Sequence, residues 1–198
     1  MPRVMPALLL VLGIGLTAAA HAQTAEVPNE RVDAIFRQWS AATPGCAVGV
    51  SREGRARLEK AYGMADLERG VPNSVDTIFE AGSVSKQFTA AAVLLLAQDG
   101  KLSLDDPVRK HVPELPDYGT PITIRQMLNH TSGRRDWGTV VAAGGWPRGS
   151  RIYTHDHVLD VVSRQKSLNY RPGTEYLYTN TGYNLAAIIV ERVSGKSL

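Results

Sequence analysis

The sequence contains a single cysteine, Cys46, among its 198 residues, and it has no run of charges of one sign. One cysteine cannot form a disulfide within the chain. Cys46 begins the apolar run 46–50 and has no adjacent histidine or cation, which indicates a small packing residue rather than a nucleophile. The formal net charge is only +3 and is spread along the chain, so we expect no nucleic-acid partner.

Long hydrophobic runs are also missing, because a membrane-spanning helix needs about 20 consecutive apolar residues. The most apolar stretch, 4–20, is interrupted by proline and glycine, follows Arg3, and ends at the small residues around His21. A basic start, a short apolar segment and a small-x-small cleavage site are typical of a secretory signal peptide. We therefore expect a signal peptide at 1–22, a mature chain from about Gln23, a periplasmic or secreted location, and no membrane span after cleavage.

The stretch 78–100 organises the rest of the chain. Residues 84–98 contain neither proline nor glycine and are apolar on nearly every side, which predicts a buried helix that ends at Gly100. Ser83 precedes this helix, and Lys86 falls on the same side of its first turn. A serine hydroxyl needs a nearby base, and Lys86 can act as one only when uncharged, which partial burial favours. The Ser83 amide at the helix start would stabilise an oxyanion.

The spacing of Ser83 and Lys86 is weak support by itself. Serine is a common N-cap and a first-turn lysine is usually solvated. The same spacing recurs at Ser163 and Lys166, at the polar end of an amphipathic stretch with no buried helix behind it. We therefore interpret Ser163 as a decoy.

A second candidate cluster, Tyr178 and Asn180, stands just before another apolar stretch, 180–193. A phenol can transfer a proton if cations lower its pKa, and an asparagine amide can bind a carbonyl group. The alternative is that Tyr178 packs and Asn180 caps the helix. His155 and His157 are two residues apart and would point in different directions from a helix, so we expect no metal site.

The remaining patterns predict an α+β chain. Helices are expected at 29–42, 123–130, 154–164 and 180–193, and a β-hairpin at 46–50 and 56–62. The segment 63–73 is expected to be a polar connection, and the glycine-rich segment 133–151 a loop. A two-stranded hairpin is not a stable sheet by itself, so further strands are needed.

Four stretches in this order resemble the serine β-lactamase and penicillin-binding-protein superfamily, and most of all its class C β-lactamase branch with related esterases and D-alanyl-D-alanine peptidases. They are 82–89, 102–108, 127–133 and 172–183. The resemblance implies an antiparallel sheet flanked by helices, with a helical subdomain. One departure is Arg134, where the family usually has leucine.

The resemblance assigns Ser83 as the acylated nucleophile and Lys86 as the base or proton relay. It implies that Tyr178 shares the proton transfer and that Asn180 contacts the substrate or fixes Lys86. Which of Lys86 and Tyr178 is the base stays open. No metal and no cofactor are implied.

A third motif, which supplies the second oxyanion donor in this family, is expected beyond Leu198. Residues 23–198 are then the N-terminal part of the domain, without its C-terminal strands and inactive alone. We expect a secreted serine hydrolase that acts on a β-lactam, a D-alanyl peptide or a small ester. The alternative is a non-catalytic cell-wall or β-lactam sensor on the same scaffold. The oligomeric state stays open.

Overall fold

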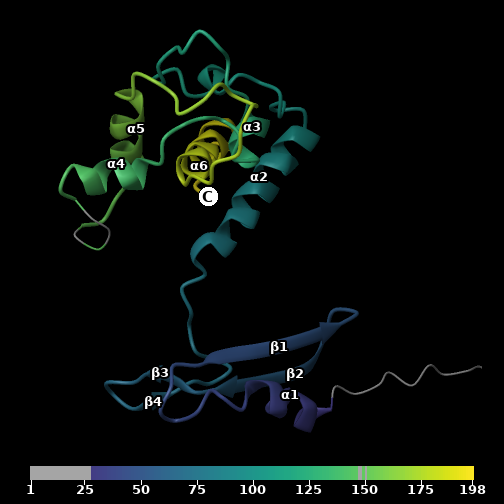
Figure 1. Ribbon diagram of the computed structural model, residues 1–198. Helices are drawn as coiled ribbons and strands as arrows, with labels where there is room; N and C mark the ends of the chain where they lie inside the picture. The colour runs from purple at the N-terminus through teal and green to yellow at the C-terminus, as the bar shows by residue number, and fades with distance from the viewer. Residues whose placement is uncertain (1–27, 147–148, 150) are drawn as a thin grey trace, which may run out of the picture. The chain divides into compact units, whose positions relative to one another are not determined.

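The computed structural model describes residues 28–146, 149 and 151–198. The chain divides into two compact units, of which the first ends at Phe79 and the second begins at Glu80 (Figure 1). Each unit is described by itself. The predicted signal peptide at 1–22 lies outside the described residues. Within those residues, the helices are too short or too polar to cross a membrane.

The first unit is built around the predicted hairpin, which is confirmed as an antiparallel pair of β1 (Cys46–Arg52) and β2 (Arg55–Tyr62). Its turn residues Glu53 and Gly54 both have positive φ, as a tight two-residue hairpin turn requires.

The segment 63–73 is more than the polar connection that we expected. This segment forms a second antiparallel pair, β3 (Met64–Asp66) and β4 (Val71–Pro72). Such short strands carry no alternating apolar pattern, and a proline inside one of them argues against a strand, so sequence periodicity could not detect them.

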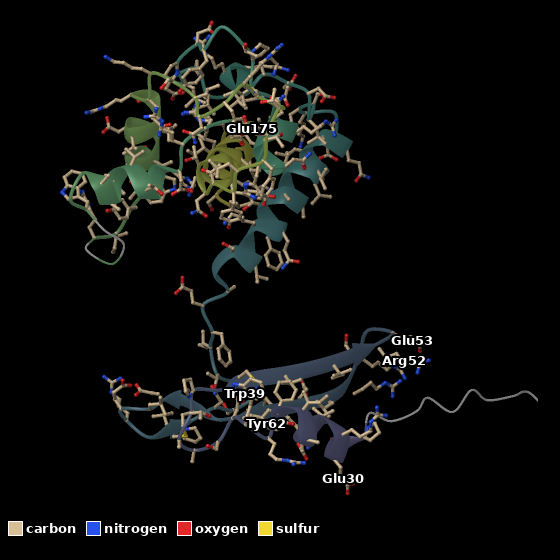
Figure 2. All side chains as sticks on the ribbon, viewed as in Figure 1. Glu30, Trp39, Arg52, Glu53, Tyr62 and Glu175 are labelled. Carbon is tan, nitrogen blue, oxygen red and sulfur yellow. The ribbon has the colours of Figure 1, made fainter. Side chains whose placement is uncertain are left out.

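Helix α1 (Asn29–Phe36) is shorter than the predicted 29–42. The backbone N–H of Ser40 donates to Thr43 Oγ1 at 2.8 Å, and hydroxyl side chains of this kind compete with helical hydrogen bonds. The Phe36 ring stacks on Tyr62 with centroids 4.9 Å apart, and its centroid lies 5.3 Å from that of Trp39. Figure 2 labels Trp39 and Tyr62 in this unit.

The second unit is helical, and α6 (Thr181–Ser194) lies at its centre (Figure 1). Around it pack α2 (Lys86–Gln98), α3 (Ile124–Leu128) and α5 (His155–Ser163). The core side chains are fully buried and come from all four helices: Val93, Ile124, Met127, Val162, Leu185 and Ile189. The predictions of α3, α5 and α6 are confirmed to within a few residues, and Thr123 and Thr154 close capping boxes at the starts of α3 and α5.

Two expectations for the second unit were wrong. The predicted loop 133–151 contains helix α4 (Trp137–Ala143), which begins after Asp136 because the Asp136 side chain accepts a hydrogen bond from the Thr139 N–H. The α2 helix is also not buried on every side. Its side chains Phe88 and Leu95 are 67% and 62% exposed, so one apolar face is not covered within its own unit.

Candidate active site

Ser83 lies in a short 3₁₀ helix, Gly82–Ser85, that runs directly into α2. Gly82 has φ of 52°, a left-handed conformation that favours glycine at this entry. The N–H groups of a first helical turn have no acceptor within the helix. The Ser83 amide is therefore placed where it can stabilise negative charge.

The structure brings together the four residues that the sequence singled out. The Ser83 Oγ and Tyr178 Oη atoms are 2.6 Å apart. Lys86 Nζ donates to Ser83 Oγ at 3.0 Å and to Asn180 Oδ1 at 2.8 Å. The serine hydroxyl therefore contacts both groups that could take its proton.

Asn180 precedes α6, but its side chain makes no capping hydrogen bond to that helix. It holds Lys86 instead. The Asn180 N–H donates to Asp136 Oδ2 at 2.6 Å, and the Thr179 hydroxyl donates to the same oxygen at 3.3 Å. Asp136 therefore fixes the segment that carries Asn180 while it also caps α4.

Sequence reasoning missed Asp136, since α4 was taken for a loop. The available signal was an aspartate immediately before a short run of helix-compatible residues, a typical N-cap position. Gly138 and the β-branched residues of that run weaken the helical pattern.

The charge of Lys86 acts on Tyr178. The Lys86 ammonium and then the Ser83 hydroxyl hold the pKa of the Tyr178 phenol below its ordinary value, against a smaller opposing effect of burial. Lys86 Nζ also lies 4.9 Å from the centroid of the Tyr178 ring. The phenolate form of Tyr178 is therefore easier to reach than in a free tyrosine.

His130 supports this tyrosine. Its ring centroid is 4.5 Å from that of Tyr178, and its Nδ1 accepts a hydrogen bond from the Thr179 N–H at 3.3 Å. A ring nitrogen that accepts must be unprotonated, and burial together with the charge of Lys86 lowers the pKa of His130. His130 is thus a neutral residue that packs against Tyr178.

The decoy residues lie elsewhere in the second unit. Ser163 is on α5, and its hydroxyl donates to the Asp160 carbonyl oxygen at 3.1 Å. His155 contacts Glu191, whereas His157 closes the capping box of α5. Over the described residues, no cluster of three or more histidine, cysteine or acidic side chains could hold a metal ion.

Ser83, Lys86, Tyr178 and Asn180 line a cavity of about 960 Å³. Its walls also include Asp136, Trp137 and Tyr153. Trp137 is held in place because its Nε1–H donates to Asn184 Oδ1 at 2.8 Å. The volume is at the upper end of the roughly 300–1,000 Å³ that is usual for ligand pockets. The cavity is therefore large enough to hold a small organic ligand beside Ser83.

Comparison with known proteins identifies the class. The chain matches the Beta-lactamase family over residues 32–198 and belongs to it, within the serine β-lactamase and penicillin-binding-protein superfamily. Protein flp of Staphylococcus aureus is 34% identical over 161 residues, which cover 78% of this chain and 31% of that protein.

Two solved structures show the same fold. The octameric penicillin-binding protein homologue from Pyrococcus abyssi is 32% identical with a TM-score of 0.69, over 85% of this chain and 39% of that one. The D-amino acid amidase from Ochrobactrum anthropi SV3 is 28% identical with a TM-score of 0.70, over 85% and 46%. The predicted superfamily and fold class are confirmed, and the chain spans about a third of the length of its curated relatives. The class C branch stays a prediction.

Proposed function

We propose that this chain carries the nucleophile of a secreted or periplasmic serine hydrolase that works through an acyl-enzyme on Ser83. The observation that carries the proposal is the contact of Ser83 Oγ with both Tyr178 Oη and Lys86 Nζ. Such a nucleophile and base within hydrogen-bonding reach, oriented by a third group, is the signature of covalent catalysis.

Tyr178 is the base in this proposal. As the phenolate, Tyr178 takes the Ser83 proton while Ser83 Oγ attacks the substrate carbonyl carbon. The carbonyl π electrons move to oxygen, and the Ser83 amide stabilises that oxyanion. Tyr178 then returns the proton to the leaving group as the bond to that group breaks, which leaves an ester on Ser83.

Deacylation repeats these transfers with water as the nucleophile. Tyr178 removes a proton from the water, the water oxygen attacks the ester, and Ser83 recovers its proton. Lys86, held by Asn180 Oδ1, stabilises the phenolate form of Tyr178 that begins each of the two steps. The assignment of Lys86 as the base is the alternative that the pH experiment below distinguishes.

The substrate in this proposal is a β-lactam, a peptide that ends in D-alanine, or a small ester or amide. A penicillin-binding protein homologue and a D-amino acid amidase of the same fold support this range, together with the size of the cavity. Both β-lactams and such peptides present a carbonyl carbon that the serine hydroxyl can attack, which leaves the serine acylated.

The test is covalent labelling of the complete gene product with a fluorescent penicillin, beside turnover of a chromogenic ester. Ser83→Ala should abolish both signals, and Ser163→Ala, the matched control, should leave both intact. Labelling that survives Ser83→Ala would exclude this nucleophile. Labelling without turnover would instead identify a β-lactam sensor, the alternative function on this scaffold.

A further inference from the structure

Thr181, the first residue of α6, connects the starts of two helices through its side chain. The residue is fully buried, with 0% of its surface exposed. Its hydroxyl donates to the Arg135 carbonyl oxygen at 2.7 Å and accepts a hydrogen bond from the Trp137 N–H at 2.8 Å. One hydroxyl therefore holds the backbone on both sides of Asp136.

The same two segments are also joined in the opposite direction. Asp136 Oδ2 accepts hydrogen bonds from the Asn180 N–H at 2.6 Å and from the Thr179 hydroxyl at 3.3 Å. Thr179 Oγ1 in turn accepts a hydrogen bond from the Thr181 N–H at 3.1 Å. The segments that begin α4 and α6 therefore hold each other, each with a side chain bonded to the backbone of the other.

Both segments carry groups of the active site, whereas Thr181 is not among the described residues that line its cavity. Asn180 presents Oδ1 to Lys86 Nζ at 2.8 Å, and Trp137 forms part of the cavity wall. Thr181 can therefore affect the chemistry through the positions of Asn180 and Trp137.

The two hydrogen bonds of Thr181 require a hydroxyl, because the same group must donate and accept. Valine has nearly the same shape as threonine but would leave the Arg135 carbonyl oxygen and the Trp137 N–H without this partner. A polar group that loses its partner inside a protein is costly, and the backbone around it shifts to recover one. Serine keeps both hydrogen bonds and loses only a methyl group.

We propose that Thr181 is a positioning residue for the acylation of Ser83. Through the backbone at the start of α4, it fixes Asn180 where its side chain holds Lys86, and it fixes Trp137 at the cavity wall. This role rests on the function proposed above. Thr181 contacts none of the reacting atoms, so it acts through its neighbours.

The experiment measures how fast a fluorescent penicillin labels Ser83 in the complete gene product, at a temperature where each variant is folded. Thr181→Val should lower this rate by about 10–100-fold, because a misplacement of about 1 Å in a catalytic site can cost about 10²-fold. Thr181→Ser should recover most of the rate. Thr123→Val is the matched control: it removes the hydroxyl that caps α3, so it should lower the melting temperature and keep the labelling rate.

Amide hydrogen exchange provides a measurement that does not depend on activity. The Asn180 N–H bonds to Asp136 and not to Thr181, so it reports on the segment rather than on the lost hydroxyl. Its exchange should be faster in Thr181→Val and unchanged in Thr123→Val. If Thr181→Val does not fold, Thr181→Cys replaces it, because a thiol is only a weak donor and acceptor.

A native labelling rate in Thr181→Val or Thr181→Cys, an equal loss in Thr123→Val, or no recovery in Thr181→Ser would overturn the proposal. No labelling of the unaltered protein would instead refute the function proposed above. In that case, unchanged exchange of the Asn180 N–H in Thr181→Val would overturn the positioning role as well.

Discussion

The ring and the hydroxyl of Tyr178 have different roles: the ring packs, and the hydroxyl takes part in the proposed chemistry. Its ring packs against His130, whereas its hydroxyl contacts Ser83 and is exposed to the influence of Lys86. The two roles can be tested separately, because phenylalanine keeps the ring and removes only the oxygen.

We predict that Tyr178→Phe lowers turnover by about 10²–10⁴-fold, the usual contribution of a positioned acid–base group. The melting temperature should change little, because the ring contact with His130 remains. Steady-state kinetics on a chromogenic ester and a thermal melt measure the two effects. Unchanged turnover would make Tyr178 a packing residue only.

The lowered pKa of Tyr178 predicts the pH dependence of acylation. A base works when it is deprotonated, so a lowered pKa moves the rising limb of the rate to a pH below the ordinary tyrosine value of about 10. Lys86→Gln removes the first cause of that shift and should move the limb upward. A limb that keeps its position in Tyr178→Phe would assign the base to Lys86.

At the scale of elements, the site depends on how α4 and α6 begin. Asp136 caps α4 and, through Oδ2, holds the N–H of Asn180 at the start of α6. The Asp136 carboxylate thus caps the start of α4 and also fixes Asn180, the residue that holds Lys86.

We predict that Asp136→Ala destabilises the protein by about 0.5–2 kcal/mol, the typical cost of a lost N-cap. Turnover should fall as well, because Asn180 loses its anchor. Asp136→Asn keeps an oxygen acceptor and a good cap, so it should recover most of the stability. Denaturant unfolding with parallel kinetics tests this pair, and an Asp136→Ala protein with native stability and turnover would refute it.

In the turn after α3, position 133 accepts only glycine, because both its backbone conformation and its surroundings exclude a side chain. A Cβ there would lie 2.2 Å from the Tyr170 carbonyl oxygen, and the residue has φ of 71°. Gly195 has the same φ of 71° and no atom within 4 Å of an added Cβ. It therefore serves as a control for the backbone conformation alone.

Gly195→Ala should cost about 1–2 kcal/mol, the price of a left-handed conformation. Gly133→Ala should cost clearly more, because the backbone of the turn must also move away from Tyr170. Equal losses of unfolding free energy in the two variants would show that the close approach to Tyr170 is unimportant.

At the scale of the whole molecule, each unit leaves apolar surface that its own described residues do not cover. One face of α2, with Phe88 and Leu95, is exposed, and each sheet in the described part of the chain has only two strands. Two-stranded sheets are marginally stable at best, and large exposed apolar patches favour association.

We predict that residues 1–198, expressed alone, bind a hydrophobic dye, aggregate readily and show no ester or β-lactam turnover above background. Among the described residues, the proposed oxyanion site has the Ser83 amide as its donor, and loss of a single donor typically costs about 10²–10³-fold in rate. Dye fluorescence, light scattering and turnover assays test this. A monomeric 1–198 chain that melts cooperatively and turns over repeatedly would contradict it.

The sequence by itself determined the elements with strong local signals. The β1/β2 hairpin and the helices α3, α5 and α6 follow from periodicity, turn residues and caps that act within a few residues. The order of the motifs around Ser83 and Asn180 was enough to identify the superfamily. Short elements such as β3, β4 and α4 escaped, because they carry too few residues to show a period.

The tertiary structure decided which side chains contact one another at the site. Ser83 and Tyr178 are 95 residues apart in the chain, yet their oxygens lie 2.6 Å apart. From the sequence, the Asn180 side chain could have capped α6. In the structure it accepts a hydrogen bond from Lys86 of α2 instead. The burial of Arg134 and the anchoring role of Asp136 likewise depend on segments distant in sequence. Such contacts are set by how the helices pack around α6, and no local pattern encodes that packing.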